Sequence, residues 1–327
     1  MAKHLSLHLL ILLLLHATTS MAVHHIETGA NELSFTYYAK SCPTMEAVVH
    51  NKVAQWIKTD LTLAPAIIRL HFHDCAIRGC DASILLNHAG SERLAKGSRT
   101  LRGFNVINDI KQELERRCPK TVSCADILTS AARDATLKVG GPFWEVPYGR
   151  KDGRVSKAKE AELVPMGHEN ITQLIDFFQA RGLNPLDLVV LSGSHTIGRS
   201  TCSSFQNRLY NFTSKGKPDP TIDPKYLKFL KKKCRGSTMS KYAPLDATTP
   251  TKFDAVYYEN LERRMGLLST DQLLYSDMRT APIVAALASQ PMLFSQQFAV
   301  SMVNLGNVQV LTGNQGEIRT NCNFVNL

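Results

Sequence analysis

The sequence predicts a single, mostly α-helical domain with very little β-structure. Apolar residues recur at helical spacing along most of the 327 residues. Alternating strand patterns are short and few, and no repeat, low-complexity linker or shift in composition marks a domain boundary. The hydrophobic content of 44% and charged content of 20% are ordinary for a soluble globular protein.

Helix signals follow one another in order. Pro65 is expected in the first turn of a helix that continues over residues 66–75. Ser123 and Asp126 suggest a capping box ahead of a helix that stops at Gly140. The remaining helices are expected from Ser41 to Ile57, around Val106 to Leu114, after the caps Asn170 and Asn184, and at 224–233, 253–265, 281–289 and 292–305.

The N-terminus has the pattern of a secretory signal peptide over residues 1–22. Lys3 precedes an apolar core that is unbroken from Leu9 to Leu15, and Ser20-Met21-Ala22 is a small-x-small cleavage site. The apolar run is too short to span a bilayer, which argues against a membrane anchor. We therefore expect the mature domain to comprise residues 23–327.

Secretion changes what the cysteines indicate. Eight cysteines, an even number, suggest four disulfides in an oxidising compartment, although spacing alone leaves their pairing open. Asn170-Ile171-Thr172 and Asn211-Phe212-Thr213 are glycosylation acceptors, which agree with secretion.

The chain is basic, with a formal net charge of +10 at pH 7. Five cations are crowded into one short stretch: Lys228, Lys231, Lys232, Lys233 and Arg235. Secretion argues against nucleic acid as a partner and favours an acidic polysaccharide or another anionic surface. The alternative is a solvated helix face without a specific partner.

The segment Arg69-Leu70-His71-Phe72-His73-Asp74-Cys75 combines groups suited to splitting a peroxide bond. On a helix, Arg69, Phe72 and His73 project from one face. His73 can take a proton from the near oxygen and return it to the leaving oxygen. Arg69 can stabilise the charge on the departing oxygen, and Phe72 would limit access to the reacting centre.

A zinc site built from His71, His73, Cys75 and Cys80 is the rival interpretation. On a helix with 3.6 residues per turn the two histidines point about 200° apart, so they do not easily share a metal ion. A zinc hydrolase would also lack three ligands with an open position.

Two long segments carry a resemblance to a known family. The chain reads RLHFHDCAIRGCDAS over residues 69–83, which resembles the distal signature of the secretory plant (class III) haem peroxidases. It reads DLVVLSGSHTIG over residues 187–198, which resembles their proximal signature. The resemblance extends from about Ser34 to Cys322 and implies the haem peroxidase fold, with the haem between a distal and a proximal helix.

The resemblance implies one haem b per chain and assigns roles around it. His195 corresponds to the axial ligand of the iron. Asp271 corresponds to the buried carboxylate that accepts the other ring N–H and makes His195 a stronger donor. Pro165 corresponds to a proline near the substrate opening, although an ordinary loop proline would look the same. Taken alone, a histidine after the helix-ending Gly193 would more often be a capped or core residue.

Two calcium sites are also implied by the resemblance, and their hard oxygen ligands suit that ion. Outside this context, such short patterns usually belong to turns or caps. The first site comprises side-chain or backbone oxygens of Asp74, Ile77, Gly79, Asp81 and Ser83. The second comprises those of Thr196, Asp246, Thr249, Lys252 and Asp254. The implied disulfides are Cys42–Cys118, Cys75–Cys80, Cys124–Cys322 and Cys202–Cys234.

The chain departs from the family pattern beside the distal histidine. An asparagine usually accepts a hydrogen bond from that histidine, whereas this chain reads SERLAKGS over residues 91–98. Ser98 is the expected occupant and Gly97 the other candidate. A serine oxygen can accept the same bond but reaches less far, so we expect His73 to be a weaker or less well-oriented base.

Together these features predict a secreted, monomeric haem peroxidase that acts in the cell wall or apoplast, or in the vacuole. Its expected partners are hydrogen peroxide and phenolic or similar small aromatic donors, which it oxidises by one-electron steps in wall crosslinking. Neither nucleic acid nor a membrane is expected as a partner. The alternative is a wall- or polyanion-binding protein that keeps the fold with weak activity.

Overall fold

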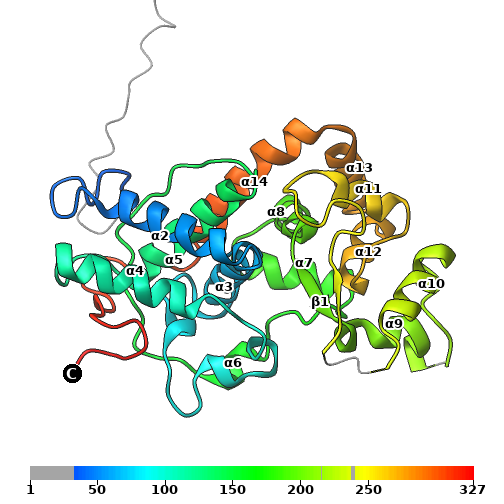
Figure 1. Cartoon of the computed structure of the whole chain (residues 1–327), viewed down its shortest axis with the longest axis horizontal. Coiled ribbons are helices and arrows are strands. Elements are labelled where there is room, and N and C mark those ends of the chain that lie inside the picture. Colours follow the sequence, from blue (N-terminus) through cyan, green and yellow to red (C-terminus); the bar gives the residue numbers. More distant parts are fainter. Residues whose placement is uncertain (1–32, 215, 237–239) are drawn as a thin grey trace, which may run out of the picture. The chain divides into compact units, whose positions relative to one another are not determined.

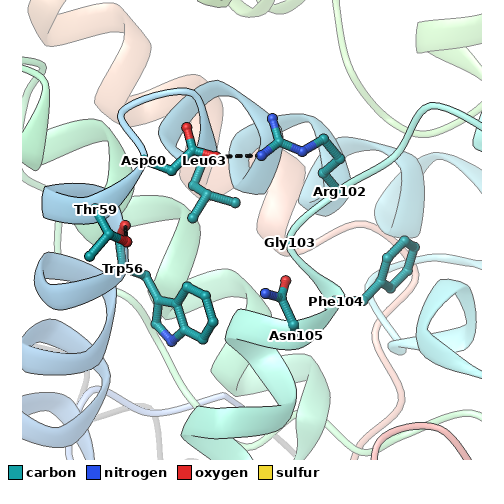
Figure 2. A pocket seen from close by; sticks show the side chains of 8 residues that line it. All are labelled: Trp56, Thr59, Asp60, Leu63, Arg102, Gly103, Phe104 and Asn105. Atoms are coloured by element: carbon teal, nitrogen blue, oxygen red, sulfur yellow. Dashed lines mark hydrogen bonds and ion pairs between the residues drawn. The ribbon is translucent and has the colours of Figure 1, made fainter.

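Helices form most of the secondary structure of the described chain, as the apolar spacing of the sequence predicts (Figure 1). The structure is a computed structural model and describes residues 33–214, 216–236 and 240–327. The predicted signal peptide at 1–22 lies outside these residues. Residues 33–327 form one unit, and no helix in its described part is long and apolar enough to cross a membrane.

Four long helices build the first part of the core. Both α2 and α3 pack extensively on α5, whose residues from Cys124 to Thr136 are all buried. In Figure 1 these helices lie together at the blue and cyan side of the unit. Their bounds are α2 (Met45–Thr59), α3 (Leu63–Arg78), α4 (Phe104–Arg117) and α5 (Cys124–Lys138).

The starts of α3 and α5 differ from the sequence prediction. Helix α3 begins at Leu63, so Pro65 is its third residue and still falls where a backbone N–H would have no helical partner. At α5 the Ser123 hydroxyl accepts from the Asp126 N–H at 3.1 Å. The capping box is nevertheless incomplete, because the Asp126 carboxylate accepts from Tyr38 and the Gly149 N–H instead.

A second group of helices follows in the chain. Complete capping boxes begin α7 at Asn170 and α8 at Asn184, as the sequence indicates. The bounds are α7 (Ile171–Gln179), α8 (Pro185–Ser192), α11 (Val256–Glu262), α12 (Ser269–Ser276), α13 (Ala281–Ser289) and α14 (Pro291–Gly306).

Helix α11 is shorter than the predicted 253–265. The Asp254 carboxylate accepts from the Val256 N–H and from the Thr249 hydroxyl, which holds the preceding residues in a loop. At the other end Arg264 has a φ of 60°, which no helix continues through. Local side-chain contacts therefore set its start, and a residue with positive φ sets its end.

A smaller apolar cluster lies under α9 (Gln206–Tyr210) and α10 (Pro224–Lys233). In Figure 1 both helices lie at the end of the unit away from α2 and α4. The two described strands, β1 (Arg199–Thr201) and β2 (Tyr242–Pro244), pair antiparallel, with Arg199 opposite Pro244. The other short elements are α6 (Ala158–Ala161), η1 (Ser83–Leu85), η2 (Glu92–Leu94), η3 (Lys96–Ser98), η4 (Gly193–Thr196), η5 (Cys202–Phe205) and η6 (Phe212–Ser214).

The described residues contain four disulfides, which are the four pairs that the resemblance implies: Cys42–Cys118, Cys75–Cys80, Cys124–Cys322 and Cys202–Cys234. Cys124–Cys322 joins the start of α5 to the C-terminal segment across 198 residues. Closing such long loops restricts the unfolded chain and stabilises the fold.

Candidate active site

Helix α3 presents Arg69 beside the loop that follows η2. The Arg69 guanidinium donates to the Gly97 carbonyl at 2.8 Å and to the Thr100 hydroxyl at 3.0 Å. The side chain is exposed, yet desolvation by the surrounding protein lowers its pKa to about 10. Arg69 is therefore closely surrounded by protein but still reaches solvent, and it keeps its positive charge at neutral pH.

One helical turn further, His73 is buried, and its burial together with the nearby Arg69 lowers the pKa of the imidazole well below its usual range. His73 is therefore a neutral base at pH 7. Phe72 is half-buried beside it, with its ring 6.1 Å from the His73 ring and stacked at 6.1 Å on Phe178. The predicted grouping of Arg69, Phe72 and His73 is present in the structure.

The predicted hydrogen bond between His73 and Ser98 is absent. Nδ1 of His73 and Oγ of Ser98 are both buried, and neither has a hydrogen-bond partner. A Cβ atom built on Gly97 would lie 3.8 Å from Cε1 of His73 and 2.9 Å from Sδ of Met166. Gly97, the other candidate, thus approaches the imidazole but carries no acceptor side chain.

The zinc interpretation is wrong. The disulfide between Cys75 and Cys80 removes both thiolates. His71 is buried against the Cys75 sulfur, with Nδ1 3.6 Å from it, and burial together with Arg150 lowers its pKa to about 3. Within the described ranges, no three His, Cys, Asp or Glu side chains converge as metal ligands.

On the proximal side, η4 carries His195 directly after α8. Nδ1 of His195 lies 2.7 Å from Oδ1 of Asp271, and the His195 side chain is 34% exposed. The buried Asp271 also accepts from the Leu268 N–H at 3.0 Å and from the Tyr257 hydroxyl at 3.0 Å. Since Nδ1 is engaged, Nε2 is the nitrogen left to bind a metal.

Gly193 does not end α8 in the way a C-terminal glycine usually does. Its φ is −60°, in the ordinary helical region, and the chain continues into η4. A Cβ atom here would lie 2.2 Å from the Tyr258 hydroxyl and 2.6 Å from Phe294. The glycine is required because α11 and α14 approach this turn closely, which fixes the position of His195.

The residues of the first implied calcium site lie together at the end of α3. The Asp74 carboxylate accepts from the Ala82 N–H at 2.9 Å, and Asp81 accepts from the Ser83 N–H at 2.9 Å. The Ser83 hydroxyl is buried without a partner. Burial and mutual repulsion raise the pKa of Asp74, and burial raises that of Asp81. Burying such carboxylates as anions is costly, and either protonation or a bound cation would relieve that cost.

Glu92 is a further buried acid close to Asp81, and no sequence pattern predicted a role for it. It is fully buried, and neither of its carboxylate oxygens has a hydrogen-bond partner. Burial, followed by the charge of Asp81, raises its pKa to about 8. The raised pKa favours the neutral, protonated form of Glu92 at pH 7.

The residues of the second implied calcium site also lie together, around α11. The Thr196 hydroxyl lies 3.2 Å from the Lys252 carbonyl and 3.4 Å from Oδ1 of Asp254. The Thr249 hydroxyl donates to the same oxygen at 2.9 Å. Asp246 has one buried oxygen without a partner, and burial raises its pKa.

The structure describes three further predicted residues, but none of them makes a contact that tests its predicted role. Pro165 is half-buried in the loop between α6 and α7, next to Met166, whose sulfur approaches Gly97. Asn170 and Asn211 are both exposed, as glycosylation requires. The Asn170 side-chain oxygen caps α7, which leaves its amide nitrogen available.

These residues fit a haem between α3 and η4. A partly exposed imidazole, with one nitrogen bound to a carboxylate, suits a residue that would bind the haem iron. The cationic Arg69 and the neutral His73 on α3 suit the side of the haem where peroxide would bind. Phe72 adds an apolar wall.

Comparison with known proteins agrees with this geometry. A family model described as peroxidase matches residues 49–290. Peroxidase 7 of Arabidopsis thaliana is 52% identical over 90% of this chain and 85% of its own length. Peroxidase 1 of the same organism is 44% identical over 90% of this chain and 92% of its own length. Peroxidase N of Armoracia rusticana is 44% identical over 90% of this chain and 91% of its own length.

Proposed function

The chain belongs to the peroxidase family, among the secretory plant haem peroxidases that reduce hydrogen peroxide, and we propose that Arg69, His73 and His195 do this work. The observation that carries the assignment is the pair of histidines in contrasting states. His73 is buried and neutral beside Arg69, whereas His195 is partly exposed and bound to a carboxylate. Haem, when bound, supplies the redox chemistry.

His73 acts as the general base and then as the general acid. It would accept a proton from one oxygen of peroxide and return it to the other oxygen as that oxygen departs. Its lowered pKa keeps Nε2 free to accept that proton at neutral pH. Arg69, held by the Gly97 carbonyl and Thr100, offers a fixed positive charge to the departing oxygen.

His195 would hold the iron through Nε2, and Asp271 would fix the tautomer and orientation of its ring. Asp271 is in turn held by two donors, the Leu268 N–H and the Tyr257 hydroxyl. We propose one haem b per chain at this position.

Two calcium ions are proposed, one beside each histidine-bearing segment. Asp74 follows His73 directly, and Thr196 follows His195 directly. The buried carboxylates and unpartnered oxygens at both places support this proposal. Each ion would then fix the backbone that carries a catalytic or iron-binding side chain.

Secretory plant peroxidases are extracellular or vacuolar, and four disulfides suit an oxidising compartment. We place this protein in the cell wall, as a monomer that oxidises phenolic donors near Pro165 and contacts acidic polysaccharide. A second candidate is a polyanion-binding protein with weak activity. It is favoured by the missing acceptor for Nδ1 of His73.

The test is purification from a secreting host, followed by an absorption spectrum and a peroxide titration of one sample. We expect a haem spectrum that changes stoichiometrically with peroxide and rapid turnover of a phenol. Replacing His195 with Ala should abolish the spectrum of iron bound by histidine. A colourless protein from haem-supplied cells would overturn the assignment, and a coloured protein with only weak turnover would favour the second candidate.

A further inference from the structure

The surface around α10 carries many cations that have no acidic partner. We call this surface, formed by residues 217–236, Lys241 and Tyr210, the α10 face. Its cations are Lys217, Lys225, Lys228, Lys231, Lys232, Lys233, Arg235 and Lys241. None forms an ion pair within the part of the chain that the structure describes.

The two acidic residues nearest to these cations, Asp219 and Asp223, bind other groups. Asp219 is buried and paired with Arg208 at 2.7 Å. Asp223 caps the start of α10 by accepting from the Lys225 and Tyr226 N–H groups. The α10 face therefore keeps a concentrated positive charge that only a molecule from outside can neutralise.

Exposed aromatic rings lie among these cations. Phe229 is 49% exposed, and Nζ of Lys233 lies 5.8 Å from its ring centroid. Tyr210 is also exposed, with Nζ of Lys231 5.1 Å from its ring centroid. An aromatic ring beside an ammonium group can take the apolar face of a sugar ring while the cation pairs with a carboxylate on that ring.

Helix α10 is held firmly in the fold, because its apolar side packs against the protein interior. Tyr226 and Leu230 are buried in the cluster that includes Phe205 and Leu209. The disulfide between Cys202 and Cys234 ties down its C-terminal end. Among the large apolar side chains of the helix Phe229 alone is exposed, which is too little for insertion into a lipid surface.

The types of cationic side chain on the α10 face indicate which class of anionic partner it would bind. Seven of the eight are lysines, which are hydrated point charges, whereas phosphate and nucleic-acid recognition favours the forked guanidinium of arginine. Charges spread along a helix suit an extended polymer better than a small anion. We propose that the α10 face binds a linear polyuronate, an acidic polysaccharide with a carboxylate on its sugar rings.

This proposal rests on the proposed function only for the secretion of the protein, since the surface does not include the haem site. The experiment measures binding of the secreted holoenzyme to polygalacturonate, with fully methyl-esterified polygalacturonate as the uncharged control polymer. Turnover of a soluble phenol with peroxide is measured on the same samples. Turnover without binding would overturn this proposal alone, and binding without turnover would overturn the proposed function alone.

The decisive variant combines Lys225→Gln, Lys228→Gln, Lys232→Gln and Lys233→Gln. Each exposed ion pair contributes up to about fivefold in affinity, so we expect binding to weaken by about tenfold or more. We also expect the wild-type affinity to fall as salt rises through the physiological range. Phenol turnover should be unchanged in this variant, because none of the four lysines belongs to the haem or calcium sites.

A control variant removes the same charge elsewhere through Lys40→Gln, Lys58→Gln, Lys138→Gln and Lys159→Gln, which are all exposed. We expect it to bind nearly as well as the wild type. An equal loss in both variants would mean that net charge alone attracts the polymer, and it would overturn the proposal. So would equal binding to the esterified polymer.

Two further measurements separate the remaining explanations. Phe229→Ser, which keeps the charge, should weaken binding severalfold, because stacking is lost. Asn211→Gln removes the glycosylation acceptor next to Tyr210 and should bind at least as well as the wild type. Loss of binding in the Asn211 variant, or equally tight binding to anionic vesicles or duplex DNA, would overturn the assignment to a polyuronate.

Discussion

Nδ1 of His195 lies 2.7 Å from Oδ1 of Asp271, and the hydroxyl of Tyr257 donates to the same oxygen at 3.0 Å. The carboxylate is buried, so its charge is shared between these donors and not with water. The electron density that His195 can offer to an iron therefore depends on how strongly Asp271 holds the ring N–H. Tyr257 competes for that oxygen.

Replacing Asp271 with Asn should raise the reduction potential of the bound haem iron. The neutral amide accepts more weakly, so His195 donates less and the higher oxidation state loses stability. A change of 10- to 100-fold, typical of such outer partners, corresponds to about 60 to 120 mV for one electron. Redox titration of the purified protein measures it, and an unchanged potential with haem retained would contradict the assigned role.

Tyr257→Phe should shift the potential in the opposite direction. Without the competing hydroxyl, Oδ1 of Asp271 binds the His195 ring N–H more strongly, which stabilises the higher oxidation state. The variant keeps the ring and its edge-on contact with Tyr258, so packing is largely preserved. A potential that moved upward in both variants would show that the carboxylate acts through general polarity and not through its bond to His195.

Ser98→Asn should speed the reaction of the resting enzyme with peroxide. Nδ1 of His73 and Oγ of Ser98 are both buried without partners, so a longer side chain can supply the missing acceptor. One added hydrogen bond of about 1.4 kcal/mol would give roughly a tenfold faster reaction. Stopped-flow mixing measures the rate constant, with Ser98→Ala as the control.

The Ser98→Ala variant should react at nearly the wild-type rate, because the serine hydroxyl makes no bond that alanine would lose. A large decrease in this control would mean that serine already orients His73. Equal rates for the Asn variant and the wild type would show that position 98 does not reach the imidazole.

Local patterns predicted the helices and much of the site. Arg69, Phe72 and His73 were predictable because one helix carries all three, so their spacing fixes their common face. The caps at Asn170 and Asn184 depend only on residues three positions away. The disulfide pairs and the calcium residues followed from family resemblance and not from spacing.

Contacts between side chains from different segments of the chain could not be predicted from the sequence. Tyr257 reaches Asp271 from a different helix, and Glu92 joins Asp81 and Ser83 only after the chain folds. Gly193 resembles an ordinary helix end, yet its real constraint is the hydroxyl of Tyr258. In each case the partner comes from a segment that no local pattern connects to it.

Removing calcium should lower turnover before it unfolds the protein. The proposed sites adjoin His73 and His195, so losing the ions frees repelling carboxylates such as Asp74 and Asp81 and displaces the catalytic groups. Much of the helical structure should survive, because the four disulfides and the core on α5 remain. Turnover and far-ultraviolet circular dichroism are compared before and after chelation, then after adding calcium or magnesium. Full activity in a calcium-free sample would refute this prediction.

His71→Leu should reduce the loss of stability in mild acid. Burial and Arg150 lower the pKa of folded His71 to about 3, below the ordinary value of 6.5 in the unfolded chain. Protonation therefore favours the unfolded state: the stability due to neutral His71 is complete above pH 6.5 and is lost as the pH falls toward 3. Between pH 7 and pH 5 this loss is about 2 kcal/mol. Urea unfolding of the holoprotein at pH 7 and at pH 5 measures this loss of stability.

We expect the difference in unfolding free energy between the two pH values to be about 2 kcal/mol smaller in the variant than in the wild type. The leucine also changes the packing against Cys75, but it does so at both pH values. An equal difference in variant and wild type would mean that His71 does not stay neutral when the protein is folded.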